Sequence, residues 1–278
     1  MGFHVGIAGG LDLAPERAHR LGARAMQLFT RSPRSWQAPP LNGETAVAFR
    51  QETLAHGLLP VAHAIYLINL ASPDEELRAR SVAAFSDEIE RCARLGIDRV
   101  VIHPGSHGLL TRAQGLRQAL RSLKECTRRT RTAAVTILLE TTSGAGRQLG
   151  GELADLAWMI DHHPEPERLG VCFDSCHLFA AGRALHEPDG LDRLLAETEK
   201  TIGLGKLGCW HLNDSLGDWN SHRDRHARIG RGKLGRDFFR RLLADERLFG
   251  VPKILEVPGG DEAFAADLRL LARLAPRG

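Results

Sequence analysis

The sequence predicts an α/β fold, a single-domain barrel in which eight parallel strands alternate with helices, written (β/α)8. Short apolar runs of strand type alternate with longer helical patterns from one end of the chain to the other. The 278 residues suffice for one large core of this kind. An open doubly wound sheet is the structural alternative, but residues 6–16, after the first strand, lack the G-x-G-x-x-G spacing of dinucleotide-binding sheets. We therefore expect a TIM barrel over residues 1–278.

Eight segments have the length and apolar character of buried strands. They are residues 3–8, 25–30, 59–64, 99–104, 135–141, 169–175, 207–214 and 253–258. Parallel strands are covered on both faces, so near-continuous apolar runs are typical of them. The longest insertions follow the second strand and the seventh, and we expect both to be loops.

The segment between the third and fourth strands illustrates the helical pattern. Val82, Phe85, Ile89 and Cys92 recur at helical spacing. Acidic residues follow Pro73 in the expected first turn, and a glycine supplies the stop. These features predict an amphipathic helix.

Composition and charge exclude several classes of protein. No run of about 18 apolar residues is long enough to cross a membrane, and the first residues do not resemble a signal peptide, so we expect a cytoplasmic protein. The five cysteines lack C-x-x-C pairing, which argues against a disulfide framework, and Cys172 and Cys176 are expected to be buried. The net charge is only +3, but 37 basic residues include just five lysines. This arginine bias suits phosphate contacts without deciding the function.

Six consecutive strands end in a side chain that can bind a metal ion. These residues are His63, His103, Glu140, Asp174, His211 and Glu256. The C-terminal ends of barrel strands meet at one mouth, where the chemistry of such folds takes place. A single polar residue at a strand end is ordinary, but six buried together would each carry a desolvation cost that needs compensation. A shared set of divalent cations would supply it.

Three further residues join this set: His177 in the motif FDSCH, and Asp224 and His226, which form a D-x-H pair in the loop after the seventh strand. Nine ligands exceed what one four- or five-coordinate ion can use, so we infer two or three ions. Nitrogen and oxygen ligands without thiolate favour Zn²⁺, with Mn²⁺ or Fe²⁺ as alternatives at some sites.

Four other histidines are assigned no metal. His107 could face the mouth, although we favour a structural role. His162 and His163 fall at an expected helix end, where solvated histidines interact with the helix dipole. His222 is expected to be exposed.

Three segments resemble the endonuclease IV family of apurinic/apyrimidinic-site endonucleases. They are HAIYLINLASP (63–73), GVCFDSCHLFAAG (170–182) and HLNDS…DRHARIGRG (211–232). Shorter matches elsewhere extend the resemblance over nearly the whole chain. It implies a (β/α)8 barrel with three zinc ions. His63 and His103 would hold the first ion and Asp174, His211 and Glu256 the second, with Glu140 bridging these two ions. His177, Asp224 and His226 would hold the third ion.

The resemblance also implies an activity. The family hydrolyses the phosphodiester 5′ to abasic sites in duplex DNA, leaving a 3′-hydroxyl and a 5′-deoxyribose phosphate, and removes 3′-blocking groups. We hypothesise that Glu140 bridges two ions and orients the attacking hydroxide, and that the third ion stabilises the leaving 3′-oxygen. The expected partner is double-stranded DNA with abasic or 3′-blocked sites, bound by a monomer.

Three positions depart from the family pattern. Ile65 stands where a serine is usual, Thr141 where an asparagine is usual, and Phe173 where an aliphatic residue is more frequent. None removes a ligand. The first two could alter the hydrogen bonds that orient the ligands, and hence metal affinity or rate.

Other residues are expected to contact DNA. The resemblance implies that Arg34, Tyr66 and Leu67 enter the base stack; the alternative is that Tyr66 and Leu67 begin a helix and pack inward. Trp36 is either a loop anchor or a DNA contact. Arg225, together with Arg223, Arg228 and Arg231, is expected to approach phosphates.

Two other functions use similar residues. A metal-dependent sugar isomerase or epimerase of the same barrel would also gather histidines and carboxylates at strand ends, but would need one or two ions. A non-catalytic zinc protein that binds damaged DNA would keep the ligands without turnover. The apparent third metal group and the arginine-rich loop argue against the first, whereas Ile65 and Thr141 leave the second open.

Overall fold

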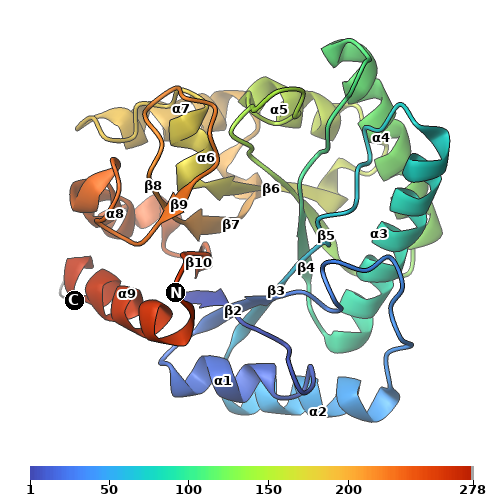
Figure 1. Ribbon diagram of the computed structural model, residues 1–278, viewed down its shortest axis with the longest axis horizontal. Helices are drawn as coiled ribbons and strands as arrows, with labels where there is room; N and C mark the ends of the chain where they lie inside the picture. The colour runs from blue at the N-terminus through green and yellow to red at the C-terminus, as the bar shows by residue number, and fades with distance from the viewer. Residues whose placement is uncertain (277–278) are drawn as a thin grey trace.

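Eight parallel strands close into a barrel at the centre of the molecule (Figure 1). The computed structural model describes residues 1–276. The barrel strands are β1 (Gly2–His4), β2 (Ala25–Leu28), β3 (Leu59–His63), β4 (Arg99–Ile102), β5 (Thr136–Glu140), β6 (Leu169–Asp174), β7 (Leu207–Leu212) and β10 (Lys253–Leu255). Their order around the barrel is β1-β10-β7-β6-β5-β4-β3-β2. The predicted TIM barrel and its eight strands are therefore confirmed.

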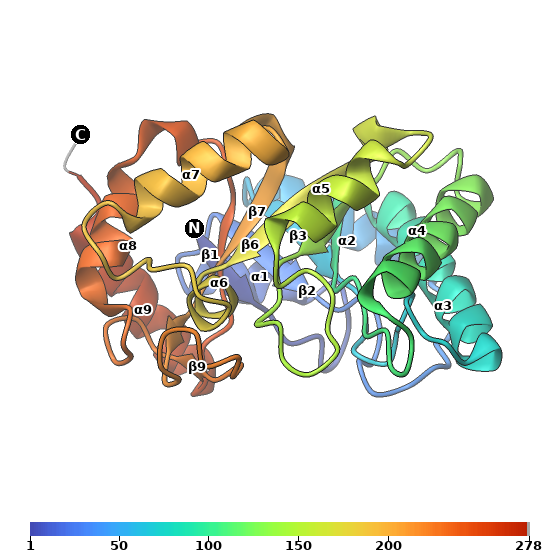
Figure 2. The same cartoon turned by 90° about the horizontal axis from the view of Figure 1, so that it is seen from above.

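Helices surround the barrel and cover the outer faces of its strands (Figures 1 and 2). They are α1 (Ala14–Arg20), α2 (Gly43–Ala55), α3 (Glu75–Leu95), α4 (Arg112–Arg129), α5 (Leu153–Asp161), α6 (Ser175–Ala180), α7 (Gly190–Thr201), α8 (Gly235–Ala244) and α9 (Gly260–Leu274). Short 3-10 turns form η1 (Pro166–Arg168), η2 (Leu204–Lys206) and η3 (Glu246–Leu248). Among residues 1–276, no helix combines the length and apolar character needed to cross a membrane.

The helix predicted between the third and fourth strands is α3. Its N-cap, Asp74, accepts a hydrogen bond from the Leu77 N–H at 2.9 Å, and the chain leaves the helix at Gly96, whose φ of 71° favours glycine. The four apolar side chains that recur at helical spacing are all buried. Capping and burial thus fix the ends and the face of this helix as the sequence predicts.

Side chains inside the barrel form two stacked layers. The lower layer is one apolar cluster made of Ala25, Val61, Val101, Leu138, Cys172, Cys209 and Ile254. Side chains alternate along a strand, so residues two positions further on point to the same side. Those residues form the upper layer, which contains Gln27, His63, His103, Glu140, Asp174, His211 and Glu256. A packed apolar plug therefore lies directly beneath the polar mouth.

A β-bulge between β6 and β7 sets which side chains face each other across these strands. The register runs from Val171 opposite Leu207 to Cys172 opposite Cys209, so Gly208 is the extra residue. A Cβ on Gly208 would lie 2.5 Å from a methyl group of Leu138, so a larger residue there would require the Leu138 side chain to move. Beyond the bulge, Asp174 lies opposite His211.

Buried charges anchor the loop after β2 to α3. The Glu88 carboxylate accepts hydrogen bonds from Thr30 Oγ1 at 2.6 Å and Arg31 Nε at 2.9 Å. Arg91 donates to the carbonyl oxygens of Thr30 and Pro39, at 2.6 and 3.0 Å. All of these polar groups except Pro39 are buried. The loop that carries Arg34 is therefore held by a satisfied ionic network.

Trp36 is an anchor of the same loop. Its half-buried ring packs against the core, and the Arg80 guanidinium lies 4.7 Å above it. This packing assigns Trp36 to the loop-anchor alternative.

The loop after β7 contains a small antiparallel ribbon that the sequence pattern did not predict. Its strands are β8 (Asp214–Ser215) and β9 (His226–Ala227). Two residues are too few to show an alternation of apolar and polar side chains. In Figure 2 this loop projects from one end of the barrel, beside α6.

Candidate metal centre

The nine predicted ligands converge at the mouth of the barrel. A cavity of about 310 Å³ is lined by His63, Tyr66, His103, Glu140, His177, Asp224, His226 and Glu256. The other two predicted ligands, Asp174 and His211, are fully buried against these residues. The ligand atoms fall into three overlapping groups.

The first group consists of His63, His103 and Glu140, whose ligand atoms lie within 4.8 Å of one another. Both imidazoles approach the same carboxylate oxygen, Glu140 Oε2, through Nε2, at 3.1 and 3.0 Å. His63 Nδ1 donates to the Ala64 carbonyl oxygen at 2.7 Å, so Nε2 is the ring atom available to an ion that lies beside the carboxylate.

The second group contains three carboxylates around one imidazole: Glu140, Asp174, Glu256 and His211 lie within the same 4.8 Å limit. His211 Nδ1 is 3.0 Å from Glu140 Oε1 and 3.2 Å from Glu256 Oε2. Glu140 is 1% exposed and Asp174 0%. Carboxylates removed from water at this spacing repel one another, so a divalent cation would be strongly favoured among them.

The third group, His177, Asp224 and His226, also lines the cavity. His177 Nε2 and His226 Nε2 each lie 3.2 Å from one oxygen of Asp224. Their Nδ1 atoms face the carbonyl oxygens of Thr141 at 2.8 Å and Glu256 at 3.3 Å, which fixes the orientation of both rings.

Asp174 also joins His177 and His226 within 4.8 Å, so it connects the second and third groups. His226 Nε2 is buried without a well-aligned hydrogen-bond partner, as expected for an atom directed at an ion. Imidazole and carboxylate donors, held by backbone carbonyls and largely buried, fit divalent cations of the zinc type.

The charges of this site raise the pKa values of His177, His211 and His226. Burial alone would lower the pKa of His226, but the charge of Asp174 and the Asp224 carboxylate, 3.2 Å away, outweigh burial and raise the pKa to about 9. The pKa values of His177 and His211 are raised well above their usual range, in each case by carboxylates that outweigh burial. For Glu140, burial is outweighed by the charges of His103 and His211, which hold its pKa well below the usual range.

These shifts predict that metal binding releases protons. Between about pH 6.5 and 9, the metal-free protein holds a proton on His226 that the unfolded chain has lost. The stability that the protonated His226 ring contributes to the folded state is therefore fully present below about pH 6.5 and is lost as the pH rises through about 9. A cation must displace this proton, so metal affinity should rise over the same range. Calorimetric titration with Zn²⁺ in buffers of different ionisation enthalpy would count the protons released.

His226→Ala should reduce this proton release by about one proton per chain. His162→Ala is the matched control, because His162 is exposed at the end of α5. Equal proton release by the wild type and His226→Ala would contradict the assignment.

Gln27 is a site residue that the sequence analysis missed. It is fully buried, its Oε1 accepts a hydrogen bond from His211 Nε2 at 2.8 Å, and its Nε2 donates to Glu256 Oε1 at 2.5 Å. These contacts leave His211 Nδ1 free to face the second group. His4 lies beside Gln27, with 3.1 Å between Nδ1 and the amide nitrogen. In the structure His4 ends β1 and Gln27 precedes the last residue of β2, but the expected strands 3–8 and 25–30 place both residues before the strand ends, so the strand-end rule did not single them out.

The contacts of Thr141 and Ile65 show what these departures from the family pattern do. The Thr141 hydroxyl accepts a hydrogen bond from the Asp174 N–H at 3.0 Å, and its carbonyl oxygen orients His177. Thr141 therefore still supports two of the predicted ligands. Ile65 is buried in the apolar core.

Asn213 is another site residue that the sequence analysis missed. Its side-chain amide donates a hydrogen bond to Asp174 Oδ2 at 2.6 Å.

Asp214 organises the loop that carries Asp224 and His226. Its buried carboxylate accepts hydrogen bonds from four backbone N–H groups, at 2.8 to 3.0 Å, those of Ser215, Gly230, Gly232 and Leu234. No spacing rule marks this residue, because its partners lie up to 20 positions away.

Asp214→Asn is expected to destabilise the protein and loosen the third group. An amide offers one acceptor oxygen where the carboxylate offers two, so buried N–H donors would lose partners, at a cost of about 3 kcal/mol. Denaturant unfolding and metal analysis would measure the loss of stability and of bound ion. Asp218→Asn, an exposed change in the same loop, should alter neither quantity. Unchanged stability in Asp214→Asn would rule out the anchoring role.

His107, His162, His163 and His222, to which the sequence analysis assigned no metal, differ from one another. His107 is buried and its Nδ1 faces the Leu110 carbonyl oxygen at 2.6 Å, a structural contact. His162 and His222 are exposed, as predicted. The expectation of a solvated role is wrong for His163, which is buried between α4 and α5. Its Nε2 contacts Thr127 Oγ1 at 3.2 Å, and burial lowers the pKa of its ring.

Of the predicted DNA contacts, Tyr66 lies at the mouth. Tyr66 is 65% exposed, lines the cavity and lies outside any helix, so the inward-packing alternative is wrong for this residue. Burial of the hydroxyl, followed by the charges of Glu256 and Glu140, raises the pKa of Tyr66 to about 12, so the phenol stays neutral. Arg34 and Arg225 are exposed, and Leu67 is half-buried against the core.

Arg228 requires a correction. Its guanidinium donates to the buried Asp267 carboxylate at 2.8 Å, which also accepts a hydrogen bond from the Ile229 N–H. The side chain is therefore engaged in joining the loop to α9. A sequence pattern cannot reveal this partner, which lies 39 positions away.

Comparisons with known proteins agree with this geometry. Residues 15–274 match the family described as xylose isomerase-like TIM barrel. Probable endonuclease 4 of Geobacter sulfurreducens is 44% identical to this chain, and the match covers 100% of this chain and 95% of that protein. Probable endonuclease 4 of Trichlorobacter lovleyi is 43% identical, and the match covers 94% of each chain. The crystal structure of endonuclease IV from Thermus thermophilus has a TM-score of 0.86 and 35% identity, covering 98% of this chain and 97% of that one. A D-tagatose 3-epimerase-like protein, at 20% identity and a TM-score of 0.74, shares the fold.

Proposed function

Since the chain belongs to the endonuclease IV family, we propose that it is a DNA repair nuclease that hydrolyses the phosphodiester 5′ to abasic sites in duplex DNA. The products would be a 3′-hydroxyl and a 5′-deoxyribose phosphate, and 3′-blocking groups would be removed by the same hydrolysis. The observation that carries this proposal is the convergence of nine metal-ligand side chains on one cavity at the barrel mouth. We further propose that the protein acts as a monomer.

We assign three divalent cations to the three groups, with Zn²⁺ as the expected ion. His63 and His103 would hold the first, Asp174, His211 and Glu256 the second, and Glu140 would join both. His177, Asp224 and His226 would hold the third. When bound, such ions lower the pKa of a coordinated water toward neutrality and neutralise charge on a phosphodiester.

Glu140 is the proposed catalytic residue. Its two oxygens face different groups, since Oε2 approaches His63 and His103 while Oε1 approaches His211. Its pKa lies well below the usual range, so the carboxylate stays charged at neutral pH. A fixed, charged carboxylate at the cavity floor can accept a hydrogen bond from the attacking water and orient it toward the phosphorus.

The third group would receive the leaving group. His177, Asp224 and His226 line the cavity, and the ring orientations of both histidines are fixed by backbone carbonyl oxygens. Asp224 is partly exposed, so this part of the cavity is open to a nucleic-acid strand that lies across the mouth. We propose that the leaving 3′-oxygen lies at this group while Glu140 orients the attacking water.

Double-stranded DNA would be read by residues at the rim. We propose that Arg34, Tyr66 and Leu67 enter the base stack at the lesion and that Arg225 approaches a phosphate. The neutral, exposed ring of Tyr66 stands edge-on to Phe29, with 5.1 Å between ring centroids, which holds it beside the cavity. A planar ring fixed in this place can fill the gap left by a missing base.

Tyr66→Ala is expected to reduce kcat/KM on an abasic duplex by about tenfold, because base–aromatic stacking contributes about 1–3 kcal/mol. Steady-state cleavage assays would measure the change, together with the melting temperature. Leu54→Ala removes another exposed apolar side chain, on the outer helix α2, and should leave kcat/KM unchanged. If Tyr66→Ala matched this control, Tyr66 would not be a DNA contact.

One experiment tests the function itself. The metal-replete protein is incubated with a duplex that carries a single abasic analogue, and the strand is examined for a nick on the 5′ side of the lesion. A nick supports the nuclease. Binding without a nick would favour a non-catalytic reader of damaged DNA, and neither binding nor a nick would favour a small-molecule isomerase or epimerase.

A further inference from the structure

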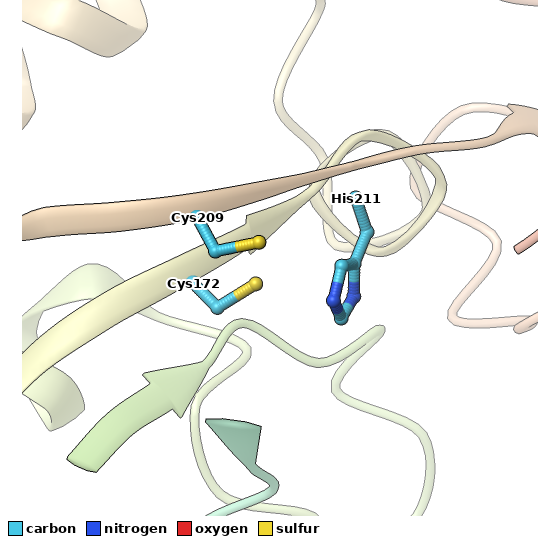
Figure 3. Close-up of side chains that lie close together, drawn as sticks. All are labelled: Cys172, Cys209 and His211. Carbon is cyan, nitrogen blue, oxygen red and sulfur yellow. The ribbon is translucent and has the colours of Figure 1, made fainter. Parts of the chain in front are cut away.

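Two cysteines lie side by side directly beneath the candidate metal centre (Figure 3). Cys172 on β6 and Cys209 on β7 are Cα partners across the two strands. Each precedes a proposed metal ligand by two positions, Asp174 and His211 respectively, so all four side chains point into the barrel. The bulge at Gly208 creates this pairing, because without it Cys172 would face a glycine.

The two thiols and His211 form a compact donor set. Their sulfur atoms and one ring nitrogen of His211 lie within 4.8 Å of one another. Figure 3 shows both sulfurs turned toward the imidazole ring from adjacent strands. Both cysteines are free and fully buried. A thiol–thiol–imidazole set is soft, unlike the carboxylate-rich groups above it, and thiophilic cations prefer such donors.

The surroundings isolate this set. The other members of the lower layer are Ala25, Val61, Val101, Leu138 and Ile254, all apolar. A cation there would be bound by the two sulfurs and His211 in a medium of low polarity, where metal–thiolate attraction is strong. His211 connects this set to the cavity above, because it contacts both the two thiols and Glu256, which lines that cavity.

We propose that Cys172, Cys209 and His211 form a site for one thiophilic cation of the Cd²⁺ or Cu⁺ type, and that this site competes with the candidate metal centre for His211. As each Sγ–metal bond forms, the thiol proton passes to the solvent, and no electron is transferred. His211 can serve the lower site only by giving up its contact with Gln27 or with the carboxylates. Occupation of the lower site therefore disturbs the second metal group.

Spectroscopy can test binding independently of activity. The metal-replete protein, kept reduced by a phosphine, is titrated with Cd²⁺ while the ultraviolet thiolate-to-cadmium charge-transfer band is recorded. Ions bound by nitrogen and oxygen ligands give no such band. We expect a band that saturates at about one ion per chain in the wild type and is largely lost in Cys172→Ala and Cys209→Ala.

Controls distinguish this pair from the other cysteines. Cys126→Ala removes a buried cysteine from the outer helix α4 and should keep the full band. Cys176→Ala removes a sulfur that lies near Asp224 and His226, and it should also keep most of the band. Cys209→Ser removes the sulfur but nearly preserves the side-chain volume, so it replaces the alanine variants in this test if those variants do not fold. Absence of the band in the wild type, or its persistence in Cys209→Ser, would overturn the proposal.

A second measurement tests the competition for His211. Cleavage of the abasic duplex is measured at increasing Cd²⁺, with each protein compared with its own cadmium-free rate. The wild type should lose activity at a Cd²⁺ concentration at least about tenfold lower than Cys209→Ser, which lacks one of the two soft ligands. Equal sensitivity of the two proteins would show that the thiols do not draw His211 away.

Discussion

Glu140→Gln is expected to lower the rate of cleavage by about 10³-fold or more, about 4 kcal/mol of barrier, while the protein still binds DNA. The two carboxylate oxygens face separate ligand groups, and an amide can offer an acceptor oxygen to only one of them. The NH₂ group would instead point at an imidazole or an ion. Single-turnover cleavage of an abasic duplex by the metal-replete variant would measure the loss, and a binding assay would measure the retained affinity.

Glu152→Gln is the matched control for this change. Glu152 lies at the N-terminus of α5, exposed, where it pairs with Arg183 at 3.2 Å. The same loss of charge there should leave cleavage within about twofold of the wild type, because surface ion pairs contribute about 1 kcal/mol or less. Retained turnover in metal-replete Glu140→Gln would refute the catalytic role.

Removal of the metal ions is expected to abolish cleavage and to lower the melting temperature by roughly 10 °C. A cation that binds only the folded state at about 1,000 times its Kd contributes about 4 kcal/mol. The second group gathers three carboxylates around one imidazole, with two of the three fully buried. Without cations, these carboxylates depend on protonated histidines for compensation.

Thermal unfolding of chelator-treated and mock-dialysed protein would measure this loss, with metal content determined on the same samples. Re-addition of Zn²⁺ should restore both the melting temperature and the cleavage. An unchanged melting temperature in protein shown to be metal-free would mean that the ligands do not contribute to stability.

The barrel could be predicted from sequence because each strand carries its own signal. Strands that are buried on both faces require continuous apolar runs, and eight such runs determine the topology once they alternate with helices. The ligands at strand ends could be predicted for the same reason, since strand position alone directs them to the mouth. The prediction did not include Gln27, because the expected strand 25–30 ends three residues beyond it and because an amide is not a usual metal ligand.

Contacts between residues far apart in sequence could not be predicted. Asp214 is a buried anchor because of backbone donors up to 20 positions away, and Arg228 is held by Asp267 on α9. His163 is buried because α4 packs over the end of α5, which no local pattern indicates. The ribbon β8–β9 is likewise too short to leave a periodic signal. Each of these features depends on tertiary packing rather than on local propensity.

The bulge at Gly208 decides which residues of β7 face the mouth. A regular strand that kept Gly208 would pair it with Cys172, and Trp210 would then stand opposite Asp174 in place of His211. Deletion of Gly208 would restore regular pairing and leave His211 opposite Asp174. The position of this ligand therefore depends on a backbone conformation as well as on the identity of the side chain, so a design that copies β7 with Gly208 has to copy the bulge too.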